Sequence, residues 1–283
     1  MQLTMKKMGA AAIAAALALC VAPAMAMLTP GTAHAAGKTD INSADIDVVT
    51  TKLVKKTGEY KSLTTYKNGK QVKPAVKVTV WQSGSYDAEG NYIPGKSIKL
   101  KKGKDYTVSY KNNKNIGTAQ VVVKGKGAYK GTAYYNFSIK PKATKVTKVK
   151  GEKKALNVSW KKVSAKQVDG YVVSVYTRDK KKHTVTEWDG DKKYTYKKYG
   201  YTHVKDVVVK NPSATSVKVK GLKKKTKYYV TVQPYKFVSG TYKERYNQWD
   251  EAEEKIIGTR VVDQAYAGAS WAQASDYKAG KTK

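Results

Sequence analysis

Apolar and polar residues alternate with a period of two along most of the chain after residue 40. Residues 76–80, 106–110 and 216–220 each place apolar or aromatic side chains between Lys, Thr or Ser. A period of two puts successive side chains on opposite faces of an extended strand, so these segments predict short β-strands with one buried and one solvated face. No segment after residue 40 shows the 3.6-residue period of an amphipathic helix. We therefore predict an all-β fold of two tandem antiparallel β-sandwiches.

The same pattern divides the chain into modules. The first predicted sandwich covers residues 40–140 and is followed by Pro141, which interrupts the alternation. The second predicted sandwich covers residues 143–258. Residues 259–283 are rich in Ala, Gly, Ser and Lys and show no alternation, so we expect a flexible tail there.

The first 35 residues have the features of a secretory signal peptide. Lys6 and Lys7 precede an uncharged apolar run over residues 10–22, and small residues suited to cleavage end at Ala26 and at Ala35. Cleavage after Ala35 is favoured because a Pro-Gly pair breaks the helix just before it. The apolar run is shorter than the ~20 residues that span a bilayer, so we expect no transmembrane segment in the mature chain. The protein is thus predicted to be secreted, with or without association to a cell wall.

The amino-acid composition limits the classes of partner and of chemistry that the protein can have. The chain has 55 Lys and Arg against 21 Asp and Glu, with three arginines in all, and its formal net charge is +34. This charge indicates either a solvated lysine surface or attraction to an anionic polymer. Nucleic acid is not expected as a partner, because arginine is scarce and the chain is exported. A single cysteine, Cys20, and three histidines leave little material for cysteine or histidine chemistry.

The second segment contains a characteristic spacing of aromatic, glycine and leucine residues, namely Trp160, Gly170, Tyr171, Leu222, Tyr228 and Trp249. With this spacing the segment resembles a fibronectin type III domain of the kind found in bacterial surface and secreted proteins. It implies that these residues build the core, that Leu222 and Tyr228 form a corner with a hydroxyl-to-backbone bond, and that Trp249 opens the last strand. Between Tyr176 and Ser216 the chain is longer than the family usually allows. The insertion, residues 177–210, is therefore a departure from the family pattern.

Three stretches of the first segment also follow a known pattern, namely residues 72–80, 100–119 and 121–137. In these stretches the segment resembles an immunoglobulin-like module repeated in exported proteins of gut bacteria. Asn112, Asn113 and Gly117 suit the left-handed turn of a hairpin. The resemblance implies an immunoglobulin-like β-sandwich.

The insertion is the candidate ligand site. It gathers one tryptophan and four tyrosines among lysines, namely Trp188, Tyr194, Tyr196, Tyr199 and Tyr201. Aromatic faces flanked by lysine suit sugar rings or an anionic polymer, but tyrosines also pack across strands, and the sequence leaves both interpretations open.

The sequence offers no assembled catalytic or metal site. No nucleophile, base and orienting residue occur together. The acids in turn-like segments lack the regular spacing of a calcium loop; these acids are Asp87, Glu89, Glu187, Asp189 and Asp191. We predict no catalytic residues, no metal and no cofactor. The sequence favours a non-enzymatic binding or adhesion protein for an anionic cell-wall polymer or surface glycan. The alternative is an accessory or spacer module of a secreted hydrolase.

Overall fold

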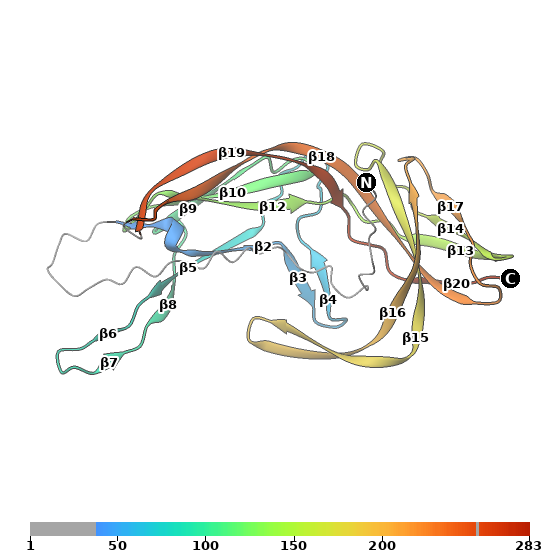
Figure 1. Ribbon diagram of the computed structural model, residues 1–283, viewed down its shortest axis with the longest axis horizontal. Coiled ribbons are helices and arrows are strands. Elements are labelled where there is room, and N and C mark those ends of the chain that lie inside the picture. Colours follow the sequence, from blue (N-terminus) through green and yellow to red (C-terminus); the bar gives the residue numbers. More distant parts are fainter. Residues whose placement is uncertain (1–37, 253–254) are drawn as a thin grey trace.

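The computed structural model describes residues 38–252 and 255–283, and the signal peptide predicted for residues 1–35 lies outside these ranges. The described residues form β-strands joined by turns, with one short 3-10 helix, η1 (Ile41–Ser43), and no α-helix. The prediction of an all-β fold is confirmed. Figure 1 shows an N-terminal module, residues 38–140, beside a C-terminal module, residues 141–283, with long hairpins reaching from the second toward the first.

The N-terminal module is built on two three-stranded antiparallel sheets. One sheet has the order β2 (Asp45–Val49), β5 (Ala75–Gln82), β8 (Lys96–Lys99), and the other β12 (Thr132–Ile139), β10 (Gly117–Gly125), β9 (Tyr106–Lys111). Smaller pairs are β1 (Thr39–Asp40) with β11 (Tyr129–Lys130), β3 (Thr51–Val54) with β4 (Glu59–Ser62), and β6 (Ser85–Tyr86) with β7 (Tyr92–Ile93). Alternate residues of both sheets, including Val78, Val121 and Phe137, share one buried apolar cluster. The module therefore has a core of its own.

The C-terminal module is a second pair of sheets. The smaller sheet has the order β13 (Val146–Glu152), β14 (Ala155–Trp160), β17 (Ser216–Lys220). The larger sheet has the order β16 (Lys192–Val209), β15 (Gly170–Asp189), β18 (Lys227–Asp250), and β18 then pairs with β20 (Lys278–Lys281) near its start and with β19 (Lys255–Trp271) further along. Strands β15, β16, β18 and β19 extend well beyond the sandwich as two long hairpins (Figure 1).

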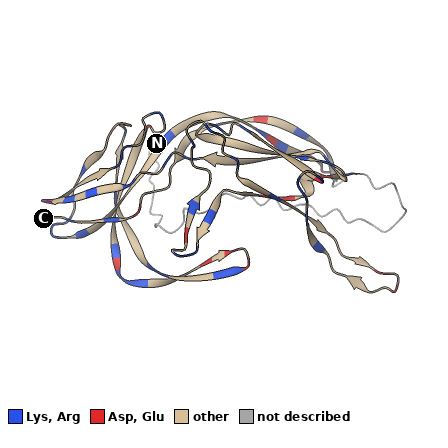
Figure 2. Cartoon of the chain, turned by 180° about the vertical axis from the view of Figure 1, so that it is seen from behind, with Lys and Arg blue, Asp and Glu red and all other residues tan. Residues whose placement is uncertain are grey.

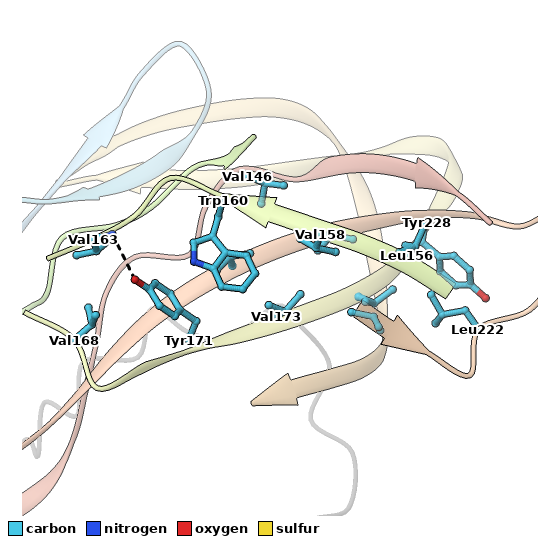
Figure 3. Packing of buried hydrophobic residues seen from close by; sticks show 14 residues of the cluster. Val146, Leu156, Val158, Trp160, Val163, Val168, Tyr171, Val173, Leu222 and Tyr228 are labelled. Atoms are coloured by element: carbon cyan, nitrogen blue, oxygen red, sulfur yellow. Dashed lines mark hydrogen bonds between the residues drawn. The ribbon is translucent and has the colours of Figure 1, made fainter. Parts of the chain in front are cut away.

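The core of the C-terminal module lies between these sheets, and Figure 3 shows its packing. The Trp160 and Tyr171 rings lie 5.1 Å apart between centroids, and the Tyr171 hydroxyl accepts a hydrogen bond from the Val163 amide at 3.4 Å. Leu222 and Tyr228 are buried at the other end, and the Tyr228 hydroxyl accepts from the Lys223 amide at 3.0 Å. This bond ties the start of β18 to the turn before it.

The end of the chain differs from the expectation of a flexible tail over residues 259–283. These residues instead continue β19 and form β20, whose Gly280 lies against Val149 and Leu156 of the other sheet. Strand β20 completes the sheet next to β18, a role the sequence analysis had given to the strand after Trp249. Trp249 lies on β18 in register with Ile256, and its side chain is outside the part that the structure describes. The small residues of β19 are held in a strand by pairing with β18 rather than by their own propensity.

The two modules are joined by the β18–β19 hairpin, which crosses β10 and β12 (Figure 1). The Arg245 guanidinium donates to the Asp40 carboxylate at 2.8 Å and to the Thr132 carbonyl at 3.2 Å. The Tyr266 hydroxyl accepts from the Thr118 amide at 3.1 Å. These contacts join segments more than a hundred residues apart in the sequence. The two modules are therefore packed against each other and not connected by the chain alone.

Candidate functional site

The aromatic residues predicted as a ligand site lie along the β15–β16 hairpin, but the structure spreads them over different surroundings. Tyr199 and Tyr201 lie near the sandwich, where the Tyr199 ring faces Arg178 at 3.9 Å and the Tyr201 ring stacks on Tyr277 at 3.7 Å. Trp188 is 56% exposed near the tip, beside the turn residue Gly190. The five rings are thus not presented together as one open surface.

Tyr194 and Tyr196 instead face the β3–β4 hairpin of the N-terminal module. The amine of Lys55 lies 5.4 Å from the centre of the Tyr194 ring. The Tyr196 ring lies against Gly58, where an added Cβ would come within 2.4 Å of ring carbons. Glycine is therefore needed at residue 58 both for this close approach and for its φ of +64°.

Hydrogen bonds complete this contact, which we call the clasp and define as Gly58, Tyr60, Trp188, Tyr196 and Lys198. The Tyr60 hydroxyl donates to the Trp188 carbonyl at 2.9 Å, and the Lys198 amine donates to the Gly58 carbonyl at 2.6 Å. Burial raises the pKa of Tyr196, and its buried hydroxyl has no hydrogen-bond partner among the described residues. The clasp is a second connection between the modules, separate from the β18–β19 hairpin.

Between the two connections lies a cavity of about 870 Å³, which we call the inter-module cavity. Its lining comes from both modules and consists of residues 50, 51, 60, 62, 138, 140, 187, 233 and 269–274. Two aromatic side chains contribute, Tyr60 at 37% exposed and Trp271 at 42% exposed. The remaining polar lining is mostly hydroxyl and amide groups, with Glu187 held near Lys198 at 3.5 Å. Such a lining offers ring faces and neutral hydrogen-bonding groups together.

A second cavity of about 520 Å³ lies where residues 140–145, which we call the linker, enter the C-terminal module, and we call this cavity the junction pocket. It is lined by Asn68, Lys142, Ala143, Thr144, Lys145, Lys161, Lys162, Val163, Ser164 and Gln167. Four of these residues are lysines and none is acidic. Because no carboxylate neutralises the lysines from within the lining, the pocket is suited to an anion.

The linker connects the two cavities. Lys140 lines the inter-module cavity, while Lys142 and Lys145 line the junction pocket. Figure 2 shows that basic residues are also spread over most elements of both modules, so the junction pocket lies within a generally positive surface.

The described residues offer little for catalysis or metal binding. No group of three or more His, Cys, Asp or Glu side chains within residues 38–252 and 255–283 could hold a metal ion. His183 and His203 lie at the surface, each 2.8 Å from an aspartate. The Asp87 carboxylate is occupied by the turn itself, accepting from the amides of Glu89 and Asn91. No helix in the part of the chain that the structure describes is long and apolar enough to cross a membrane.

The C-terminal module, with its paired sheets and its Tyr228 corner, is similar to a known domain family. Residues 140–249 match the fibronectin type III domain family. These residues form a fibronectin type III domain. A search of curated proteins found no match to the chain. The fibronectin type III match ends within β18, before the strand that completes the sheet, because the β18–β19 hairpin separates β18 from β20. A fibronectin type III domain is generally a non-catalytic binding or spacer module.

Three residues that the sequence predicted for the core of the fibronectin type III domain are buried and lie in strands, namely Trp160, Gly170 and Tyr171. Neither cavity was predicted from the sequence. Lysines at the end of one module and the start of the next were a usable signal for the junction pocket, because Pro141 stiffens the link between them. Trp271 gave no such signal, since it lay in a segment without alternation.

Proposed function

We propose that this is an exported, non-enzymatic bacterial protein that binds an anionic polysaccharide of a cell surface. In this proposal an immunoglobulin-like module and a fibronectin type III domain together form the binding site at their junction. The protein acts in the secreted state or while attached to the cell wall. Its ligand is held without chemical change.

The observation that carries the proposal is the junction pocket. Four lysines and several neutral polar groups line about 520 Å³ without one carboxylate. An ammonium group is a compact charge that attracts carboxylate, phosphate or sulfate groups alike. The excess of positive charge over the whole molecule draws a polyanion to the surface before it reaches the pocket.

The inter-module cavity supplies the part of the site that suits sugar rings. Trp271 and Tyr60 are half-exposed in it, and ring faces of this kind pack against the apolar faces of sugars. Since the linker lines both cavities, one polymer chain lying along residues 140–145 can place sugar units in one cavity and an anionic group in the other.

Binding of polygalacturonate, followed by calorimetry at low salt, tests the proposal. The junction variant changes Lys142, Lys145, Lys161 and Lys162 to Gln. We expect its affinity to fall roughly tenfold or more, since exposed charge pairs contribute about 0.2–1 kcal/mol each. Trp271→Ala should weaken binding without changing its salt dependence, because it removes a ring and no charge.

The matched control changes four exposed lysines away from both cavities to Gln, namely Lys148, Lys150, Lys220 and Lys224. It removes the same net charge, so a loss of affinity equal to that of the junction variant would show general attraction and contradict a site at the junction. No measurable binding by the wild-type protein would contradict the proposal itself and favour a spacer role for the fibronectin type III domain.

The same charge provides a way to stay at the cell. If retention is electrostatic, a wash of intact cells at about 1 M salt should release the protein, because screening then acts within ~3 Å. Retention through that wash would require another attachment.

A further inference from the structure

A two-stranded ribbon projects from the N-terminal module, and we call residues 80–98 the arm. It comprises the end of β5, the β6–β7 pair and most of β8. From Val80 outward, β5 pairs with β8 alone, because β2 pairs with β5 only as far as Thr79. Figure 1 shows the arm standing clear of both modules. Along the arm, neither outer edge has a strand partner among the described residues.

The arm exposes large apolar side chains. Trp81 is 65% exposed, Tyr86 72%, Tyr92 60% and Ile93 50%. The Trp81 ring lies over Gly95, where a Cβ would come within 2.7 Å of it. One edge of the ring thus lies against the ribbon, while most of the side chain stays exposed. Clustered exposed apolar groups of this kind mark interaction surfaces.

Lysine is absent from the arm over a long stretch. Residues 78–95 contain no Lys or Arg and two acids, Asp87 and Glu89, in a chain with 55 basic residues. In Figure 2 the outer part of the arm accordingly carries red but no blue. This stretch offers no positive charge to attract an anionic polymer, so the arm is not an extension of the lysine-rich surface.

A second lysine-free stretch of similar length covers residues 261–277, which include most of β19. In the described chain β19 pairs with β18 only, so its outer edge is open. Val261 is 45% exposed on this strand. Exposed edges usually carry lysine, which discourages the addition of further strands. This edge lacks that protection.

We propose that the arm of one copy of the protein adds to the open edge of β19 in a second copy. Both surfaces present unpaired backbone groups and apolar side chains, as strand addition requires. Residues 78–95 of the first surface and 261–277 of the second contain no Lys or Arg, so two strongly basic molecules can meet there without direct repulsion between the surfaces in contact. Within one molecule the arm points away from β19 (Figure 1), so the contact is between copies. Because arm and edge are different surfaces, the contact is head-to-tail and joins more than two copies, as a closed ring or an open chain.

Salt dependence separates this association from the proposed function. The contact itself contains few charges, whereas the two bodies carry a large positive charge and repel each other. Added salt screens that repulsion, so self-association strengthens as salt increases. Polyanion binding weakens over the same range, and either proposal can therefore fail alone.

Sedimentation velocity of the full mature chain at about 0.5 M salt tests the proposal, since body-to-body repulsion is screened there to within a few ångströms. We expect species larger than the monomer that grow with protein concentration. The arm variant, Trp81→Ser with Tyr86→Ser, and the edge variant, Val261→Lys with Ala265→Lys, should each be monomeric. These side chains are exposed, and circular dichroism should show both variants folded.

Two controls match the variants. Val204→Ser with Val208→Ser removes exposed apolar groups from β16, and Thr184→Lys with Thr186→Lys adds two charges to β15. Both should associate as the wild type does.

Mixing provides the decisive result. The arm variant keeps an intact edge and the edge variant keeps an intact arm, so an equimolar mixture should form dimers of one copy of each. A wild-type protein that stays monomeric, variants that associate unchanged, or a mixture that stays monomeric would each overturn the proposal.

Discussion

Gly58 shows how one residue can set a contact between distant segments. A side chain at this residue meets both a positive φ and the Tyr196 ring. Local sequence carries no sign of the second constraint, because the ring belongs to a strand more than a hundred residues later.

We expect Gly58→Ala to lower the free energy of unfolding more than Gly69→Ala. Gly69 has a similar φ of +78°, but no atom of the described chain lies within 4 Å of an added Cβ there. Both substitutions cost about 1–2 kcal/mol for the left-handed backbone. Only Gly58→Ala must also displace Tyr196. Equal losses in denaturant unfolding would show that the clasp is not tight at this point.

Tyr277 is a second residue whose surroundings can be tested, through the pKa of its hydroxyl. Burial of its hydroxyl, with Tyr176 and Tyr201 close by, raises the pKa of Tyr277 to about 12. Since the folded pKa is above the unfolded value of about 10, the stabilising contribution is present below pH 10 and is lost as the pH rises toward 12.

Tyr277→Phe should therefore flatten the fall in the free energy of unfolding between about pH 10 and 12. The difference between the ultraviolet titrations of wild type and variant isolates one phenol from the others. A difference curve centred near pH 10 would contradict the burial of this hydroxyl.

Among the strands, local alternation predicted those whose two faces differ. Strands β9 and β17 alternate between buried or half-buried and exposed residues, and both were readable as strands from sequence alone. Strand β19 was not readable, because Ala, Gly and Ser have low strand propensity and its stability comes from β18 beside it. The lengths of the hairpins depend on what they pack against, which local sequence does not encode.

The pairing of β20 with β18 gives a testable prediction about the stability of the C-terminal module. Deleting residues 278–283 should lower the thermal stability of the C-terminal module, because it removes the pairing with β18 over residues 227–230. It also removes Thr282, whose hydroxyl donates to the Lys223 carbonyl at 2.6 Å. Differential scanning calorimetry measures the effect. A variant with unchanged melting temperature would indicate that these residues are the loose tail first expected.

Over the whole molecule, the cavities are assembled from segments that meet only after both modules have docked. The inter-module cavity combines residues near 50, 140, 187 and 270. No motif links such distant residues, so the sequence predicted the aromatic hairpin as a candidate site and gave no indication of the inter-module cavity. The sandwiches could be predicted from pattern; their docking could not.

The ion pair between Asp40 and Arg245 bridges the two modules, so its coupling energy reports how strongly they are held together at this point. The Arg245 side chain is 15% exposed and the Asp40 side chain 39%. In a double-mutant cycle with Asp40→Ala and Arg245→Ala, we expect a coupling energy of about 0.5–3 kcal/mol. Asp263→Ala with Lys243→Ala is a control pair on the more exposed part of the same hairpin, held at 3.1 Å. Its coupling should be smaller, since exposed pairs are screened by solvent.

The coupling should also depend on pH. Burial opposes ionisation of Asp40, but hydrogen bonds from Asn42 and Arg245 and the charge of Arg245 outweigh it, so the pKa of Asp40 is lowered. The contribution is therefore present above the ordinary value of 3.8 and is lost as the pH falls below it. A coupling energy that stays constant through this acid range would show that the carboxylate is not the partner of Arg245.

The position of β20 has a consequence for biosynthesis. Its partner β18 cannot complete the sheet until residues 278–281 are available, some fifty residues after β18 begins. A nascent chain emerging from the ribosome, or threaded N-terminus first through a narrow translocation channel, thus keeps its second sandwich unfinished while the whole β18–β19 hairpin passes. Translation that stops before residue 278 yields a polypeptide with an open sheet, which proteases can remove.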